Sequence, residues 1–225
     1  MKRIVIKVGS NVLTRNDGKL NVTRMSAIVD QVVWLRRQGY EVILVSSGAV
    51  AAGRAELSVQ HKLDSVEQRQ LFSAIGQVKL TGLYYDLFRE YGIRIGQVLT
   101  MKENFASRRE YLNQRACMGV MLDNGVVPIV NENDTVSVTE LMFTDNDELS
   151  GLIATMMGAQ QLIILSNIDG IYTGSPVDPQ SKLIPMVEPG RDLSEYIQQE
   201  KSGLGRGGMT TKCSIARKVA DEGIE

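Results

Sequence analysis

Short apolar runs alternate with longer amphipathic segments along this chain. The runs at 2–8, 41–45, 93–99, 126–130 and 161–165 are rich in Val, Ile and Leu, which predicts β-strands. Helical spacing of apolar residues marks the stretches at 24–38, 67–90, 109–123, 145–157 and 211–222. Strands that alternate with helices indicate βαβ units. Because the strands are apolar throughout, we expect helices on both faces of a mostly parallel sheet.

Local signals refine this α/β pattern. Thr23 is a plausible N-cap for the first long helix, and the helix at 67–90 is expected to be interrupted at Gly76 and Gly82. Pro128 lies inside a predicted strand, where it cannot donate a ladder hydrogen bond, and this is a conflict within the prediction. Alternating polarity at 135–142 suggests a hairpin strand. No repeat or linker divides the chain, so we expect one domain.

Composition narrows the class of protein. Of the 225 residues, 43% are hydrophobic and 23% charged, which is the balance of a globular chain with a sizeable core. Lys and Arg number 25 against 26 Asp and Glu, so the basic excess of a nucleic-acid binder is missing. No signal peptide or membrane-length apolar run is recognisable, and we expect a cytoplasmic protein.

The cysteines and the histidine offer little chemistry. Cys117 and Cys213 lie far apart and form no metal-ligand spacing, so two reduced, partly buried thiols are expected. His61 lies in a polar stretch and is expected to be exposed. The sequence therefore contains no credible histidine base and no Ser-His-Asp arrangement.

Polar or glycine-rich segments follow four of the predicted strands. They are 7–11, 46–49, 131–134 and 166–170. In an open α/β sheet the carboxyl ends of the strands and the N-termini of the following helices form the ligand site. The four segments therefore predict one shared site. Gly9 and Gly48 would let the backbone approach a phosphate or carboxylate, although each is also an ordinary turn glycine taken alone.

The segment 203–212 is the most informative. Its four glycines within six residues run directly into a helix, and Lys212 falls in the first turn of that helix. Successive backbone N–H groups there form an anion-binding nest, and a cation at a helix N-terminus is favoured only beside an anion. The segment is not a Walker loop. The alternative is a flexible linker before the last helix.

Four charged residues are candidates for this site. Lys7, near the end of the first strand, either reaches solvent or points into the shared site. Asp145 at the start of a helix is an ordinary capping residue. Asp134 and Asp147 would hold Mg²⁺ through water or orient lysines.

The ordered motifs resemble a known family. IKVGS at 6–10, VSSGAVAAG at 45–53, NEND at 131–134, DND at 145–147 and GLGRGGMTTK at 203–212 are similar to those of bacterial glutamate 5-kinases within the amino-acid kinase family. This resemblance covers the chain from Lys2 onward. It implies an α/β fold, a three-layer αβα sandwich with a mainly parallel central sheet, and a reaction that makes glutamyl 5-phosphate from glutamate and ATP with Mg²⁺, the first step of proline synthesis.

The resemblance also implies roles for individual residues. Lys7 and Lys212 would contact the transferring phosphoryl group, and Asp147 would hold both lysines. The glutamate site would comprise Ser47, Gly48, Asp134 and Asn146. The nucleotide site would comprise Lys7, Gly9, Ser166, Asn167, Arg206, Gly207, Gly208, Met209, Thr210, Thr211 and Lys212. No protein metal ligand is assigned.

The match departs from the family pattern at two places. Ser166-Asn167 stands where Thr-Asp is expected, which weakens the nucleotide assignment there. Residues 1–225 are expected to form one kinase domain that lacks its last strands and has no PUA domain. The resemblance further implies a homo-oligomer, a dimer or tetramer, with proline as inhibitor.

Three alternatives stay open. Another amino-acid kinase would act on acetylglutamate, aspartate or carbamate. A nucleotide-sensing module would keep the fold without turnover, although it has no need for both Lys7 and Lys212. RNA binding is not supported by any basic patch in the sequence. No membrane contact is expected.

Overall fold

A computed structural model describes residues 2–137, 143, 145–188 and 208–225. Its central sheet has five strands in the order β3-β4-β2-β1-β5, and all four pairings are parallel. The strands are β1 (Lys2–Val8), β2 (Tyr40–Ser46), β3 (Ile95–Thr100), β4 (Val127–Glu132) and β5 (Gln161–Leu165). The predicted mainly parallel sheet is thereby confirmed.

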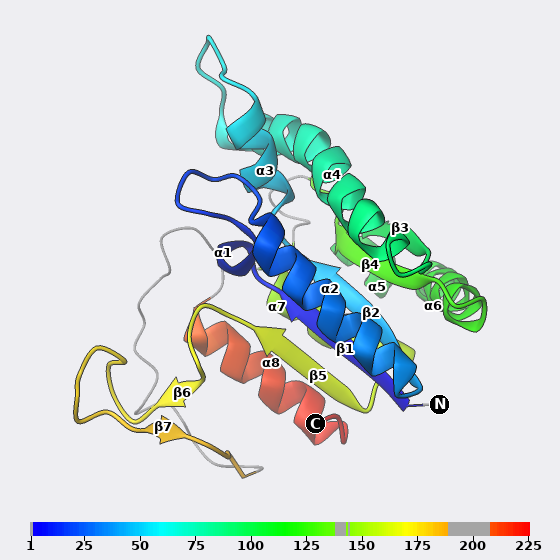
Figure 1. The fold of residues 1–225 in the computed structure, drawn as a ribbon, viewed down its shortest axis with the longest axis vertical. Helices are drawn as coiled ribbons and strands as arrows, with labels where there is room; N and C mark the ends of the chain where they lie inside the picture. Colours follow the sequence, from blue (N-terminus) through cyan, green and yellow to red (C-terminus); the bar gives the residue numbers. More distant parts are fainter. Residues whose placement is uncertain (1, 138–142, 144, 189–207) are drawn as a thin grey trace.

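Helices cover both faces of the sheet (Figure 1). They are α1 (Ser10–Leu13), α2 (Val22–Arg37), α3 (Ala49–Glu56), α4 (Ser65–Arg89), α5 (Lys102–Ala106), α6 (Arg108–Asp123), α7 (Asn146–Met157) and α8 (Met209–Asp221). A two-stranded hairpin of β6 (Ile171–Tyr172) and β7 (Leu183–Ile184) follows β5. None of the described helices is both long enough and apolar enough to span a membrane.

Strand alternation divides the core into two layers. Ile4, Ile6 and Val8 of β1 pack on one face with α2 and α4, whereas Val5 packs on the other with α6, α7 and α8. Successive side chains of a strand point to opposite faces, so a continuous apolar strand feeds both layers. The arrangement is the three-layer αβα sandwich that the family resemblance implies.

The register of β4 resolves the conflict at Pro128. The Val127 N–H donates to the Arg94 carbonyl on the β3 side at 2.9 Å. Because neighbouring residues of a strand face opposite sides, the nitrogen of Pro128 faces β2. The pairing of β4 with β2 begins only at Ile129. Pro128 therefore occupies a position at which the ladder requires no donor.

Several local predictions were wrong. The N-cap of α2 is Asn21, whose side chain accepts from the Arg24 N–H, and Thr23 lies inside the helix. Residues 135–137 form a turn rather than a strand, and the remainder of the expected hairpin, 138–142, lies outside the described residues. The short helices α1, α3 and α5 were not predicted. Cys117 is exposed, although Cys213 is partly buried as expected.

The helix α4 runs through Gly76 and Gly82 without interruption. At Gly76 the helix crosses α3, and an added Cβ would lie 1.8 Å from the Ala49 carbonyl oxygen. At Gly53 of α3 a Cβ would lie 1.8 Å from the Phe72 carbonyl oxygen. The two glycines thus permit backbone-to-backbone packing of α3 on α4, which fixes the position of the segment between β2 and α3.

We expect Gly76→Ala to destabilise the fold by about 1–3 kcal/mol or more, because the new methyl meets backbone that cannot give way. Gly82→Ala is the matched control in the same helix, since no atom of the described residues lies within 4 Å of its added Cβ. That substitution should stabilise the protein by up to about 1 kcal/mol. Denaturant unfolding of both variants measures the difference, and equal effects would contradict the crossing geometry.

Candidate active site

Lys7 of β1 reaches the first turn of α7 at the carboxyl end of the sheet. Alternation along β1 puts its side chain on the same face as Val5, toward α7 and α8. The helix α7 begins there because Asp145 caps it, accepting from the N–H groups of Asp147 and Glu148 through one carboxylate oxygen. The cap and the strand together bring Asp147 to Lys7.

One buried carboxylate joins two lysines that are 205 positions apart in the sequence. The Lys7 ammonium lies 2.5 Å from Asp147 Oδ1, and the Lys212 ammonium donates to Asp147 Oδ2 at 2.9 Å. The Asp147 side chain is 1% exposed, Lys7 7% and Lys212 19%. Lys212 comes from the first turn of α8, as predicted. The two cations therefore converge on one point.

Burial and charge compete in setting the ionisation of Asp147. Burial alone would raise the pKa of this carboxyl. The charge of Lys7 and the hydrogen bonds from both lysines outweigh it, so the pKa of Asp147 lies below its usual range. The group is therefore an anion at neutral pH, and the two lysines share a single countercharge.

Asp145 has the opposite balance. Burial and the nearby charge of Asp147 raise its pKa, although the backbone N–H groups of Glu148 and Asp147 and the charge of Lys7 act against this shift. Its second oxygen, Oδ2, is buried and has no hydrogen-bond partner among the residues that the structure describes. Asp145 is the capping residue the sequence indicated, and it is also a carboxyl group whose charge burial disfavours.

Asn146 begins a second polar network on the other side of α7. Its amide group donates to Ser47 Oγ at 2.8 Å and to Asn131 Oδ1 at 2.9 Å. The Asn131 amide in turn donates to Gln77 Oε1 at 2.9 Å. This network connects the start of α7 with the ends of β2 and β4 and with the middle of α4. Two predicted substrate residues, Ser47 and Asn146, are in direct contact.

Asp134 belongs to a neighbouring buried cluster. The Arg69 guanidinium of α4 bonds the Asp134 carboxylate through Nε and the Glu132 carboxylate through Nη2. Glu132 also accepts from the Phe143 N–H at 3.1 Å, and its own N–H donates to Asn131 Oδ1 at 2.9 Å. Asp134 is therefore joined to the Asn146 network through adjacent residues of β4.

The two glycines at strand ends serve different purposes. Gly48 has a φ of 104°, a left-handed conformation that favours glycine, and it caps α3 directly after Ser47. Gly9 has an ordinary φ of −73°. A Cβ on Gly9 would lie 3.5 Å from the Lys7 ammonium, so this glycine leaves room beside the lysine.

The predicted nucleotide residues are only partly placed. Ser166 and Asn167 follow Leu165, which pairs with Val8 next to Lys7. Ser166 donates to Asn167 Oδ1 at 3.4 Å. Gly208 caps α8, and Met209, Thr210 and Thr211 form its first turn with Lys212. Arg206 and Gly207 lie outside the described residues. In the described ranges no three His, Cys, Asp or Glu side chains group as a metal site.

Comparison with known proteins identifies the family of this chain. The sequence matches the model of the amino acid kinase family over residues 2–225. The chain belongs to the amino acid kinase family. It is 71% identical over 222 residues to the glutamate 5-kinase of Bacteroides thetaiotaomicron, covering 99% of this chain and 62% of that protein. It is 49% identical over 227 residues to the glutamate 5-kinase of Chlorobaculum tepidum, with 99% and 62% covered.

A solved structure supports the fold. The UMP kinase of Bacillus anthracis superposes with a TM-score of 0.53 at 20% identity, covering 81% of this chain and 72% of that one. At this identity the likeness concerns the fold alone. The present amino acid kinase chain spans about three fifths of the length of the curated relatives it matches.

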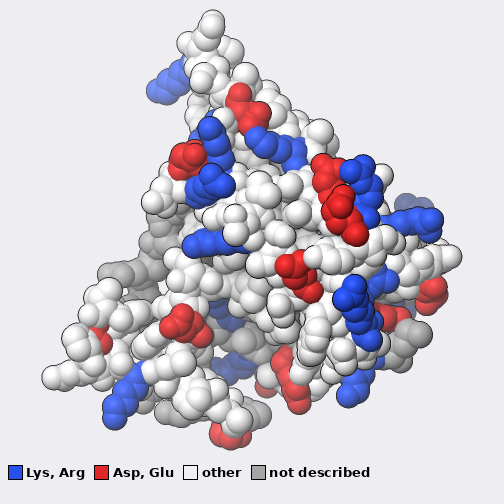
Figure 2. Space-filling view, in the orientation of Figure 1, with Lys and Arg blue, Asp and Glu red and all other residues white. Residues whose placement is uncertain are grey.

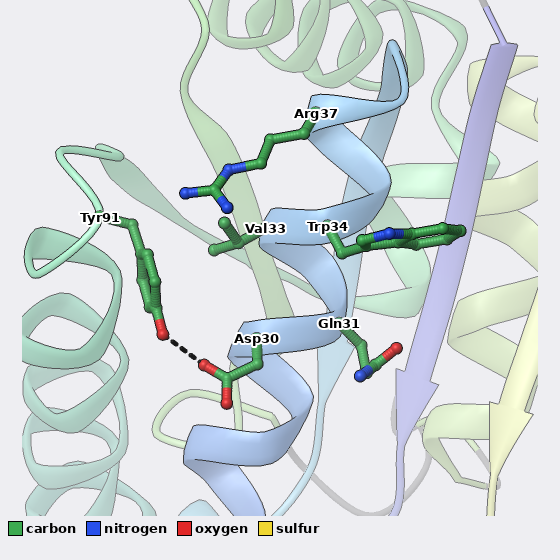
Figure 3. Close-up of a pocket in the computed structure, with 6 residues that line it drawn as sticks. All are labelled: Asp30, Gln31, Val33, Trp34, Arg37 and Tyr91. Atoms are coloured by element: carbon green, nitrogen blue, oxygen red, sulfur yellow. Dashed lines mark hydrogen bonds between the residues drawn. The ribbon is translucent and has the colours of Figure 1, made fainter.

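Two surface hollows lie apart from the lysine pair of this amino acid kinase. One, of about 460 Å³, is lined by Trp34, Arg37 and Tyr91, with the Tyr91 hydroxyl donating to Asp30 at 2.5 Å (Figure 3). The other lies between α4 and β3. Neither includes a predicted site residue. On the face drawn in Figure 2, acidic and basic side chains are interspersed, and no basic patch stands out.

Sequence reasoning missed Arg69, Gln77, Asn131 and Glu132. Asn131 and Glu132 lie in a polar strand end that the sequence had marked, but without a role for either. No sequence signal marked Arg69 and Gln77, because the apolar and polar positions of α4 are only weakly segregated.

We expect Asp145→Asn to raise the melting temperature at pH 7. Asparagine also caps helices, and the substitution removes a charge that burial disfavours. The pKa of Asp145 is raised in the folded state, so ionisation costs stability as pH rises through that pKa and costs nothing below the unfolded pKa. The gain should therefore vanish below about pH 4. Thermal unfolding from pH 3 to 8 tests this, and a lower melting temperature at pH 7 would contradict it.

Proposed function

We propose that this chain transfers the γ-phosphoryl group of ATP to the γ-carboxylate of L-glutamate, giving glutamyl 5-phosphate and ADP. The observation that carries the proposal is the convergence of Lys7 and Lys212 on Asp147, directly beside the polar network of Asn146. The curated relatives named as glutamate 5-kinases support the choice of acid.

The chemistry requires charge neutralisation rather than a base. A γ-carboxylate has a reference pKa near 4.3, so it is already a nucleophile at pH 7. The obstacle is the approach of one anion to a polyanion. Two ammonium groups held by a shared carboxylate are suited to bind the equatorial oxygens of the phosphoryl group in the transition state. Catalysis of the in-line transfer then depends on positioning and electrostatic stabilisation.

Asp147 has a positioning role in this proposal. It fixes both ammonium groups before substrate arrives, which avoids reorganisation during the reaction. One carboxylate only partly neutralises two cations. Lys7, Lys212 and Asp147 together therefore carry a net positive charge that attracts phosphate oxygens, and the nearby Asp145 carboxylate reduces it.

The nucleotide would bind at the ends of β1 and β5 and at the first turn of α8. Gly9 leaves space beside Lys7, and the N-terminal N–H groups of α8 suit a phosphate. Mg²⁺ usually keeps several waters and is bound by one or two carboxylates together with substrate phosphates. Oδ2 of Asp145, which has no hydrogen-bond partner among the described residues, fits such a role. Bound there, the ion would neutralise phosphate charge. Ser166 and Asn167 are the proposed contacts at β5, with Arg206 and Gly207 beyond the described residues.

The acid substrate would lie on the Asn146 side of α7. Ser47 Oγ and the Asn146 amide suit a carboxylate or carbonyl oxygen, the left-handed Gly48 leaves the backbone open, and Asp134 suits an α-ammonium group. A cytoplasmic setting, a homo-oligomer and inhibition by proline belong to the same proposal, and they rest on the family resemblance.

We predict that Lys7→Ala and Lys212→Ala each lower kcat about a hundredfold or more, with a smaller change in the KM for glutamate. A cation ~4 Å from developing charge is worth about 4 kcal/mol at an effective dielectric near 20, and about 1.4 kcal/mol corresponds to tenfold in rate. Steady-state kinetics with coupled ADP detection measures both constants.

Lys2→Ala is the control, because Lys2 lies at the exposed, opposite end of the same strand. Its kcat should match the wild type. A near-wild-type kcat for either of the other two lysine variants would remove that lysine from the phosphoryl path.

Asp134→Ala should chiefly raise the KM for glutamate, by about tenfold or more, because a charged hydrogen bond to substrate is worth about 1.5–3 kcal/mol. The KM for ATP should change little. Circular dichroism establishes that the variant folds. A folded variant with unchanged glutamate KM would exclude Asp134 from the substrate pocket.

A substrate survey distinguishes the proposal from its nearest alternatives. ADP release is measured with glutamate, acetylglutamate, aspartate and carbamate, and without acid. Stimulation by glutamate alone supports the assignment. Stimulation by another of these acids instead would replace the substrate, and tight ATP binding with no transfer would indicate a nucleotide-binding module.

A further inference from the structure

The helix α4 carries a polar stripe on the face that it buries. Arg69, Ser73 and Gln77 follow one another at intervals of four and are 9%, 3% and 9% exposed. Residues four apart lie above one another on a helix. Charged and amide side chains are rarely buried unless they have partners to satisfy. We therefore expect the three polar side chains of the stripe to bond to other buried groups.

The two ends of the stripe contact the two halves of the acid site. Gln77 accepts from Asn131, which also accepts from Asn146. Arg69, two helical turns earlier, bonds both Asp134 and Glu132. Ser73 between them makes a local bond to the Gln70 carbonyl. Side chains of α4 thus contact the end of β4 and support the turn that follows it.

The geometry of Arg69 depends on its forked guanidinium. Nε and Nη2 point to two different carboxylates, which lie two positions apart in the sequence at the end of β4. The Arg69 side chain is 10% exposed, Glu132 5% and Asp134 8%. Two buried carboxylates this close would repel each other, and one would take up a proton, without a cation between them. Arg69 keeps both acids charged and holds their directions.

We propose that Arg69 is a positioning residue for the acid substrate, which it serves by orienting and keeping ionised the Asp134 carboxylate that receives the substrate's ammonium group. This inference rests on the proposed function, because it needs an amino acid in that pocket. Arg69 does not contact the substrate itself. It acts through Asp134, while its bond to Glu132 fixes the guanidinium against the end of β4.

The position of the helix makes this arrangement rigid. The packing of α4 on α3 through Gly76 and Gly53 leaves no space for sliding. A capping box at Asp64 and Glu67 fixes the first turn of α4, immediately before Arg69. Asp134 lies in a turn after β4, where the backbone alone would direct its side chain less strictly. Arg69, held in place by α4, therefore fixes the direction of the Asp134 side chain.

The test compares Arg69→Met and Arg69→Lys with Lys79→Met on the full chain. Lys79 is the matched control, since it lies in the same helix and pairs with Glu56 at the surface, with 42% of each side chain exposed. We expect Arg69→Met to raise the KM for glutamate about tenfold or more, with kcat and the KM for ATP within about threefold. Arg69→Lys keeps the charge without the fork and should give a smaller rise. Lys79→Met should leave all three constants unchanged.

A double variant shows whether Arg69 acts through Asp134. In an Asp134→Asn background, adding Arg69→Met should raise the glutamate KM by less than about twofold, because the group that Arg69 orients is already neutral. If the two substitutions acted independently, their fold-changes in the glutamate KM would multiply in the double variant. The inference would be overturned by such multiplication, by an unchanged glutamate KM in Arg69→Met, or by equal losses of kcat and ATP affinity in that variant.

Two further outcomes are distinct. If neither Arg69→Met nor Arg69→Lys folds by circular dichroism, Arg69 has a structural role and the inference is wrong. If the wild-type chain, assayed in parallel, does not phosphorylate glutamate, the proposed function is the part that fails. If the wild type is active and the Arg69 variants keep its KM for glutamate, only the positioning role is refuted.

Discussion

The site depends on one buried carboxylate that holds two ammonium groups from opposite ends of the chain. Asp147 is almost fully enclosed, so its charge is tolerated only because Lys7 and Lys212 compensate it. The same interaction ties β1, α7 and α8 together, since these are the elements that carry the three residues. Loss of the central carboxylate would leave two cations close together in a poorly hydrated region, where each disfavours the other. The interaction therefore organises the fold at this edge, and in the proposed reaction it would set the charge available to a phosphoryl group.

The start of α7 connects the two halves of the site. Asn146 faces the Ser47 and Asn131 network, and the next residue, Asp147, faces the lysines. Neighbouring residues in the first turn of a helix point in different directions, so one helical terminus would serve both the proposed acid pocket and the proposed phosphoryl pocket. Asp145 accepts two backbone N–H groups to hold that terminus in shape. The donor and acceptor of the reaction would meet across a single turn.

Much of this arrangement could be predicted from the sequence. The strands 2–8 and 161–165 were predicted with the bounds that β1 and β5 have, because buried parallel strands give continuous apolar runs. Lys7 could be placed at the shared edge because the polar strand ends of a parallel sheet lie together. Its pairing with Lys212 and Asp147 followed from the family resemblance. The interrupted helix at 67–90 was wrong because a glycine weakens a helix in isolation, whereas Gly76 is required by the neighbouring α3. The supporting contacts of Arg69 and Gln77 depend on which face of α4 meets β4, and helical periodicity alone does not specify that partner.

The most direct test of the account is a crystal structure of the chain with ADP, Mg²⁺, aluminium fluoride and glutamate. Aluminium fluoride imitates a phosphoryl group in transfer. The account predicts that the ammonium groups of Lys7 and Lys212 both lie within about 3.2 Å of its fluorine atoms, with the glutamate γ-carboxylate in line on the Asn146 side. Fluoride bound away from either lysine, or glutamate bound on another face of the molecule, would contradict it.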